Sequence, residues 1–161
     1  MITKFFFYIT FILMIFSTSM GYSQNISPEK VVDIKVKANT VRLKKDGIIE
    51  ANISLNIMRG WHINADKPLD NNLSPTIVKI KNNPDFKLIS IKYPMPILKK
   101  LGFSDSDLAL FENQATVILE LKSLKKIKPG KIKIDGEVDY QPCNDQTCLF
   151  PVSKPFSIIV K

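Results

Sequence analysis

The sequence predicts an all-β protein, an antiparallel β-sandwich in a single domain. Three observations support this prediction. Apolar and polar residues alternate along several segments, turn signals separate those segments, and no segment repeats apolar residues every 3.6 positions. Roughly eight or nine short strands joined by turns are typical of a sandwich. The chain has 161 residues, a length that suits one domain with its own core.

The clearest strands are four segments in which one apolar face alternates with a polar one. They cover residues 32–36, 49–57, 115–121 and 132–138. Shorter strands are expected over residues 61–65, 76–80, 86–93 and 156–160. Asp46-Gly47 is a hairpin turn signal before the second of the long strands.

Residues 97–111 are the one long stretch without a strand pattern. Their apolar residues are interrupted by Gly102 and by the cluster Ser104-Asp105-Ser106-Asp107. Glycine and short polar residues favour turns and loops. We therefore expect a long connection here, with room for one helical turn.

The first 23 residues have the layout of a secretory signal peptide. Lys4 provides a positive start, an apolar run extends from Phe5 to Phe16, and small or polar residues follow. This run is shorter than the roughly 20 residues that a membrane-spanning helix needs. We expect cleavage after Ser23, which leaves a soluble periplasmic domain over residues 24–161.

The chain is basic, with a formal net charge of +8, and loss of Lys4 with the signal peptide would leave +7. We assign most of the lysines to the solvent faces of the alternating strands. No motif combines aromatic and basic residues, so nucleic acid is not an expected partner. The sequence does not indicate an oligomeric state.

Cys143 and Cys148 are the only cysteines, and four residues separate them in a predicted loop before the last strand. Their α-carbons can come within disulfide distance in such a loop, and export places them where disulfides persist. Three interpretations compete: a structural staple, a metal site and a redox-active dithiol. A loop this short stabilises the fold by only about 2 kcal/mol, against nearly 5 for a loop of about a hundred residues.

A metal site lacks ligands, because structural zinc takes four nitrogen or sulfur donors. The only histidine, His62, lies about 80 residues upstream and is interpreted as a strand residue beside Trp61. We therefore expect no metal and no organic cofactor. An accessible short-loop disulfide suits thiol exchange. Asp145 and the absence of a basic residue inside the loop do not favour strong thiolate activation, so the redox interpretation is only slightly ahead of the staple.

The cysteine segment Tyr140-Gln-Pro-Cys-Asn-Asp-Gln-Thr-Cys-Leu-Phe-Pro151 resembles the N-terminal periplasmic domain of the thiol:disulfide interchange protein DsbD. The upstream Gly60-Trp-His-Ile-Asn-Ala65 is similar to an early strand of that domain, and the similarity spans most of residues 28–161. The resemblance implies an immunoglobulin-like sandwich. It also implies protein-disulfide reductase chemistry through a pair of cysteines.

By position in the resembling motif, Cys148 matches the cysteine that forms mixed disulfides with partners, and Cys143 matches the resolving cysteine. The family also has a cap loop over the pair. Residues 101–107 occupy that place in this chain, and Phe103 is the candidate shield, although it could equally be an ordinary core aromatic.

The resemblance also implies the partners. Electrons would come from a thioredoxin-like or transmembrane donor and pass to envelope disulfide proteins. The family's full protein continues into a membrane conduit and a thioredoxin-like domain, whereas this chain stops at Lys161, so we expect a donor on a separate chain. The alternative is a non-catalytic immunoglobulin-like binding module with a static disulfide.

Overall fold

The computed structural model describes residues 26–39, 45–127 and 132–160. The predicted signal peptide, residues 1–23, lies outside the described residues. The described part of the chain contains one short 3-10 helix, η1 (Pro28–Lys30), and is otherwise built of strands and loops. The strands are β1 (Val32–Ala38), β2 (Ile48–Ile57), β3 (His62–Asn64), β4 (Ile77–Ile80), β5 (Phe86–Lys92), β6 (Ile97–Lys99), β7 (Leu108–Glu112), β8 (Gln114–Ser123), β9 (Ile132–Tyr140), β10 (Pro142–Cys143) and β11 (Val152–Val160).

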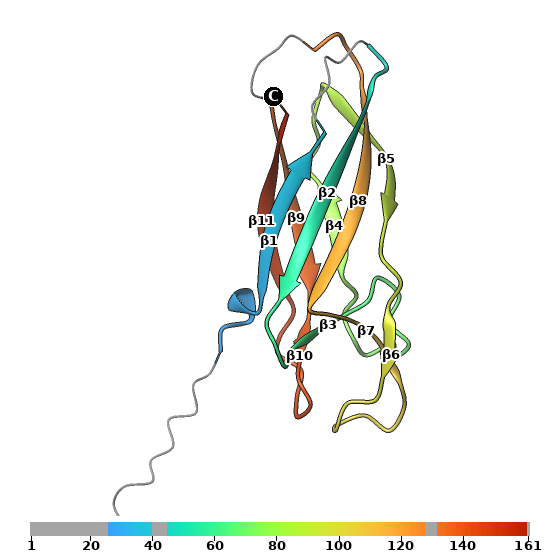
Figure 1. The fold of residues 1–161 in the computed structure, drawn as a ribbon, viewed down its shortest axis with the longest axis vertical. Coiled ribbons are helices and arrows are strands. Elements are labelled where there is room, and N and C mark those ends of the chain that lie inside the picture. The colour runs from blue at the N-terminus through green and yellow to red at the C-terminus, as the bar shows by residue number, and fades with distance from the viewer. Residues whose placement is uncertain (1–25, 40–44, 128–131, 161) are drawn as a thin grey trace, which may run out of the picture.

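Two antiparallel sheets form the layers of a sandwich, in the orders β1-β2-β8-β5 and β11-β9-β4 (Figure 1). The apolar faces predicted from alternation meet between these layers. Along β2, for example, every second residue from Ile49 to Ile57 is buried. The same cluster takes in Val117 and Leu119 from β8 and Ile134 and Val138 from β9. The prediction of an all-β antiparallel sandwich is confirmed.

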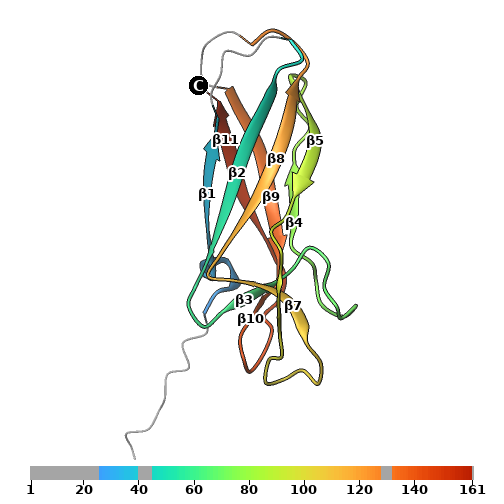
Figure 2. The ribbon, with the colours of Figure 1, turned by 45° about the vertical axis from the view of Figure 1, so that its right-hand side comes forward.

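A third, smaller sheet closes one end of the sandwich, in the order β10-β3-β7-β6 (Figures 1 and 2). Its two faces have different environments because neighbouring side chains point to opposite sides of a strand. Ile63 and Phe111 join the main core. Leu108 and Leu110 join a second apolar cluster that contains Cys143. This sheet therefore separates the sandwich core from the site of the disulfide.

The expectation of a long connection over residues 97–111 is wrong for its two ends, which are the strands β6 and β7. Between them, residues 100–107 form turns and bends, and the single helical turn is absent. In β7 the four residues Leu108–Phe111 are all buried. A strand in contact with a core on both faces has no polar side, so alternation could not reveal it.

The last strand is longer than predicted, because β11 begins at Val152 and contains Pro155. β11 lies at the edge of its sheet and pairs only with β9. Proline is tolerated on an edge strand because its missing N–H deprives no second neighbour of a hydrogen bond.

Candidate redox site

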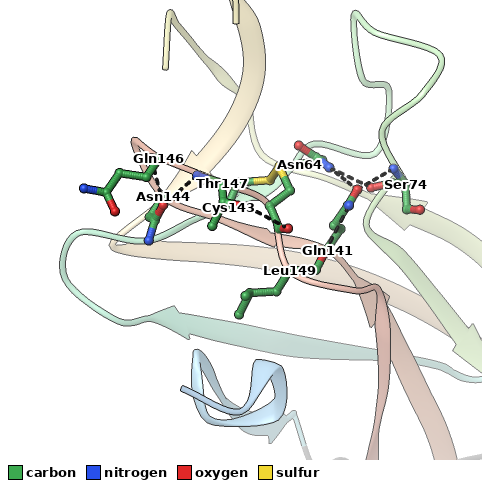
Figure 3. The surroundings of a disulfide bond; sticks show 9 residues. Asn64, Ser74, Gln141, Cys143, Asn144, Gln146, Thr147 and Leu149 are labelled. Atoms are coloured by element: carbon green, nitrogen blue, oxygen red, sulfur yellow. Dashed lines mark hydrogen bonds between the residues drawn. A yellow bond between two sulfur atoms is a disulfide. The ribbon is translucent and has the colours of Figure 1, made fainter. Parts of the chain in front are cut away.

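Cys143 and Cys148 form a disulfide across a tight hairpin at the end of the molecule that carries the small sheet (Figures 1 and 3). Their α-carbons lie 4.0 Å apart, and the two residues form an isolated antiparallel bridge. β10 brings Cys143 to the edge of β3, where its partner in the register is His62. The disulfide is thus attached to a sheet at Cys143 and to a loop at Cys148.

Asn144 organises the hairpin between the two cysteines. Its side-chain Oδ1 accepts hydrogen bonds from the backbone N–H groups of Gln146 and Thr147, each at 2.9 Å (Figure 3). Its own backbone N–H donates to the Thr147 carbonyl at 2.9 Å. Asparagine is favoured at such positions because its side chain can replace a backbone acceptor in a turn. The loop that carries the cysteines is therefore held by its own hydrogen bonds.

Gln141 anchors the base of the hairpin to the rest of the fold (Figure 3). Its Oε1 accepts hydrogen bonds from the Ser74 backbone N–H at 2.9 Å and from the Asn64 side-chain amide at 3.2 Å. Its Nε2 donates to the Leu149 carbonyl at 3.2 Å. One side chain thus joins β3, the segment before β4 and the residue after Cys148.

Tyr140 precedes this anchor and is fully buried in the main core. Its hydroxyl donates a hydrogen bond to the Pro28 carbonyl at 3.3 Å. Burial raises the pKa of Tyr140 to about 12, and the negative charge of Glu29 acts in the same direction. The strand that leads to the hairpin is therefore fixed at its end by a neutral phenol.

The two sulfur-bearing residues differ in exposure. Cys143 is fully buried in a cluster with Leu101, Leu108 and Leu110. Cys148 packs against the same cluster but remains partly exposed. A partner thiolate needs access to one sulfur of a disulfide, and Cys148 is the more exposed residue of the pair.

The segment 101–107 lies against the hairpin, and both form adjacent loops at the same end of the molecule (Figure 2). A Cβ atom added to Gly102 would lie only 2.6 Å from the Asp145 carbonyl oxygen. Leu101 is buried in the cluster around Cys143, whereas the Phe103 side chain is 42% exposed and is absent from that cluster. The segment therefore packs against the cysteine hairpin, and both its role as a cap and the shielding role of Phe103 stay predictions.

His62 is the residue near the site whose position the sequence did not reveal. It is buried in β3 opposite Cys143. On its other side, its Nε2 lies 3.2 Å from Glu112 Oε2 and 3.0 Å from Lys99 Nζ. The residues from Trp61 to Ala65 include two polar ones, His62 and Asn64, in alternate positions of a buried strand. That alternation was the available signal that one face of this strand carries a polar site.

Within residues 26–39, 45–127 and 132–160, no group of three or more histidine, cysteine or acidic side chains is arranged to hold a metal ion. The same residues include no helix that is long and apolar enough to cross a membrane.

Comparison with known proteins agrees with this geometry. The family model described as the N-terminal part of the thiol:disulfide interchange protein DsbD matches residues 25–159. This chain belongs to the DsbD N-terminal domain family. The cysteine segment, the hairpin and the small sheet all lie within the match, which confirms the resemblance found in the sequence.

Two solved structures share the fold of this DsbD N-terminal domain. The reduced N-terminal domain of DsbD from Neisseria meningitidis is 17% identical, with a TM-score of 0.51 over 84% of this chain and 90% of that one. The N-terminal periplasmic domain of ScsB from Proteus mirabilis is 10% identical, with a TM-score of 0.56 over 84% of this chain and 48% of that one. The present chain thus spans about half of the ScsB structure. No curated protein sequence matches it closely enough to count as a relative.

Proposed function

We propose that this protein is a thiol-disulfide exchange carrier of the cell envelope, which takes electrons from a thioredoxin-like donor and passes them on through Cys143 and Cys148. The observation that supports this function best is the unequal burial of the two cysteines: Cys143 is enclosed by leucines and Cys148 is partly exposed. Exchange requires one sulfur that a partner thiolate can reach and a second that resolves the mixed disulfide. The hairpin supplies both within one loop.

In the charging half of the proposed cycle, a thiolate of the donor attacks the Cys148 sulfur. The bond between Cys148 and Cys143 breaks, and its electron pair leaves on the Cys143 sulfur, which takes up a proton. The second thiol of the donor, once deprotonated, attacks its partner's sulfur and releases Cys148 as a thiolate. The donor ends as a disulfide. This protein ends with a Cys143 thiol and a Cys148 thiolate, so it has gained two electrons and one proton.

In the discharging half, the Cys148 thiolate attacks the disulfide of an envelope protein. Cys143 then resolves the mixed disulfide, and the original bond re-forms. Between partners, the 101–107 segment protects the pair from small thiols and oxidants, because it lies against the Asp145 carbonyl and buries Leu101 beside Cys143. We place this cycle in the periplasm, with residues 1–23 as the export signal and residues 24–161 as the working domain.

The first experiment is to equilibrate the native protein with glutathione and dithiothreitol buffers and to measure the reduction potential of the pair. The fluorescence of the single tryptophan, Trp61, can report whether the fold stays intact. We expect reversible reduction with a potential above about −300 mV, since structural disulfides of secreted proteins typically lie below that value. Reduction only on unfolding would reject the exchange function and favour a binding module with a static disulfide.

The roles of the two cysteines are tested by single substitutions. Cys143→Ser should trap mixed disulfides with a thioredoxin-like donor through Cys148, because no resolving thiol remains. Cys148→Ser should trap none, since the remaining thiol is enclosed by the leucine cluster. Equal trapping by both variants would contradict the assignment while leaving exchange itself possible.

A further inference from the structure

His62 is a buried residue of β3, the strand that lies between β10, which carries Cys143, and β7, which carries Glu112. The side chain belongs to β3, with β7 on one side and β10 on the other. Its partner on β7 is Glu112, and its partner on β10 is Cys143. Side chains directly opposite each other on antiparallel strands lie on the same face, with Cβ atoms about 5 Å apart. His62 therefore shares a face of the small sheet with the buried half of the disulfide.

The two nitrogens of this ring differ in their hydrogen-bond partners. Nε2 lies beside the carboxylate of Glu112 and the ammonium of Lys99, at 3.2 and 3.0 Å. Nδ1 is buried and has no hydrogen-bond partner among the residues that the structure describes. A buried polar atom without a partner is costly and requires an explanation, and a redox or catalytic role is one of the few available.

The two neighbours of Nε2 require opposite positions of the ring proton. The Glu112 carboxylate can only accept, so a hydrogen bond to it requires a proton on Nε2 and leaves Nδ1 as a bare acceptor. The Lys99 ammonium can only donate, so a hydrogen bond from it requires a bare Nε2 and places the proton on Nδ1. Lys99 and Glu112 also lie 3.7 Å from each other. The pair can therefore support either form of the ring.

We infer that His62 is the proton relay of Cys143: Nδ1 accepts the proton of the Cys143 thiol and returns it, with Glu112 and Lys99 supporting the two forms of the ring. The inference rests on the proposed exchange function and adds a residue to it. It also accounts for the unpartnered nitrogen, because a disulfide sulfur is a poor hydrogen-bond partner, whereas the thiolate formed on reduction is a strong acceptor. On this inference, His62 Nδ1 lacks a partner only in the disulfide form of the protein, which is the form that the structure shows.

Each step balances without any further reagent. When a donor thiolate attacks Cys148, the electron pair of the broken bond moves to the Cys143 sulfur, and the proton on Nδ1 transfers to it. The Lys99 ammonium, 3.0 Å from Nε2, gives a proton to that nitrogen, so the ring stays neutral and can then donate to Glu112. Lys99 is 43% exposed and regains its proton from water. When Cys143 resolves a mixed disulfide, Nδ1 takes that proton back as the thiolate attacks Cys148, and Nε2 releases its own proton through Lys99. The need for such a relay follows from burial, because a thiolate formed away from water is destabilised unless a positive charge or a donor lies beside it.

The test uses purified protein with one cysteine left, so that no exchange partner is involved. Two proteins are compared, the Cys148→Ala variant and the double variant Cys148→Ala/His62→Gln. The ultraviolet absorbance of the Cys143 thiolate, measured against pH, gives the midpoint of Cys143 ionisation in each. We expect the substitution to move the midpoint of Cys143 ionisation upward by about one pH unit or more, which is about tenfold less thiolate at a given pH below it. The matched control is the same substitution in the Cys143→Ala background, where Cys148 should shift much less.

No shift at Cys143, or equal shifts at both cysteines, would overturn the relay. Glu112→Gln keeps the histidine and changes a side chain that is 36% exposed, so it is a variant that should fold. It should move the Cys143 midpoint in the same direction as His62→Gln. The control is Glu120→Gln, which alters a comparable pair with Lys92 in the β1-β2-β8-β5 sheet, not in the small sheet that carries Cys143, and should leave the midpoint unchanged.

A second measurement needs no substitution, because His62 is the only histidine in the chain. The nitrogen resonances of its ring report which nitrogen carries the proton. We expect the Nδ1 resonance to differ between the disulfide and dithiol states, and identical resonances in both would overturn the relay. Neither readout depends on a partner, so failure of the relay and failure of the proposed exchange function are told apart by the reduction-potential experiment.

Discussion

Replacing Gly102 by alanine tests whether the 101–107 segment controls access to the disulfide. The added Cβ would lie 2.6 Å from the Asp145 carbonyl oxygen, whereas ordinary contacts begin at 3.4 Å. The segment and the hairpin must therefore separate by about 0.8 Å (3.4 − 2.6 Å). The atom that is met belongs to the backbone of a loop fixed by the Asn144 hydrogen bonds, so it cannot simply rotate away.

The expected magnitude follows from the cost of crowding a packed contact, which is about 1–3 kcal/mol. Leu101 is buried against Cys143 in the observed, closed arrangement, and we expect this burial to be lost if the segment lifts. If the closed form alone bears this cost, the population of the open form rises about 5- to 150-fold. Reduction that proceeds through the open form should accelerate by the same factor.

The assay measures the rate at which excess dithiothreitol reduces the native disulfide. The released thiols are alkylated at successive times, and mass spectrometry gives the fraction of reduced protein. The control is Gly136→Ala. Its Cβ would also lie 2.6 Å from a backbone carbonyl, that of Lys79, and would crowd Phe156 inside the sandwich. This control should lower the stability of the fold and leave the native rate of reduction close to that of the parent protein.

A rate for Gly102→Ala equal to that of the parent, or raised no more than that of Gly136→Ala, would refute the reasoning. The segment would then be a neighbour of the hairpin without any influence on access to it. Urea denaturation of both variants completes the comparison, because it shows whether their losses of stability are similar.

Three further predictions follow from the same region. Phe103→Ala should speed the reaction of the reduced cysteine pair with small thiol-reactive reagents, by less than Gly102→Ala does, because Phe103 is already 42% exposed. An unchanged rate would show that Phe103 is not part of the cap. Gln141→Leu should lower the free energy of unfolding by about 1–3 kcal/mol in urea denaturation, because the Ser74 N–H and the Asn64 amide lose their acceptor. The control is Gln146→Leu at an exposed position, and a smaller loss for Gln141→Leu than for this control would contradict the prediction. The pKa of Tyr140 is raised from 10.0 to about 12 in the folded state, so the stability that this neutral phenol provides is complete below pH 10 and is lost as pH rises towards 12. Tyr140→Phe should therefore flatten the alkaline fall of the unfolding free energy by about 2 kcal/mol, and an identical fall in both proteins would contradict it.

The sequence by itself determined the fold class and most of the strands. Alternation along residues 49–57 predicts one buried face, and the structure buries the same residues in β2. This prediction is possible because a strand with one face in a core and one in water records both environments in its own residues. The cysteine segment also identified the family before any contact was known, since its residues are adjacent in the chain.

Only the tertiary structure decided where the small sheet lies and what surrounds the disulfide. β7 shows no alternation because both its faces are buried, one in the sandwich core and one in the cluster around Cys143. The unequal burial of the two cysteines follows from that cluster, whose leucines come from β7 and from the segment before it. A local pattern cannot show which leucines will enclose one sulfur and leave the other accessible.

The position of His62 shows the same limit most clearly. The sequence contains no basic residue between the cysteines, which argued against activation of a thiolate. The pairing of β10 with β3 brings the only histidine opposite Cys143, and the pairing of β3 with β7 places Glu112 on its other side. Strand pairing is a contact between residues far apart in the chain, and its register depends on the packing of the whole sheet. The chain determined which groups exist, and the fold decided which of them meet.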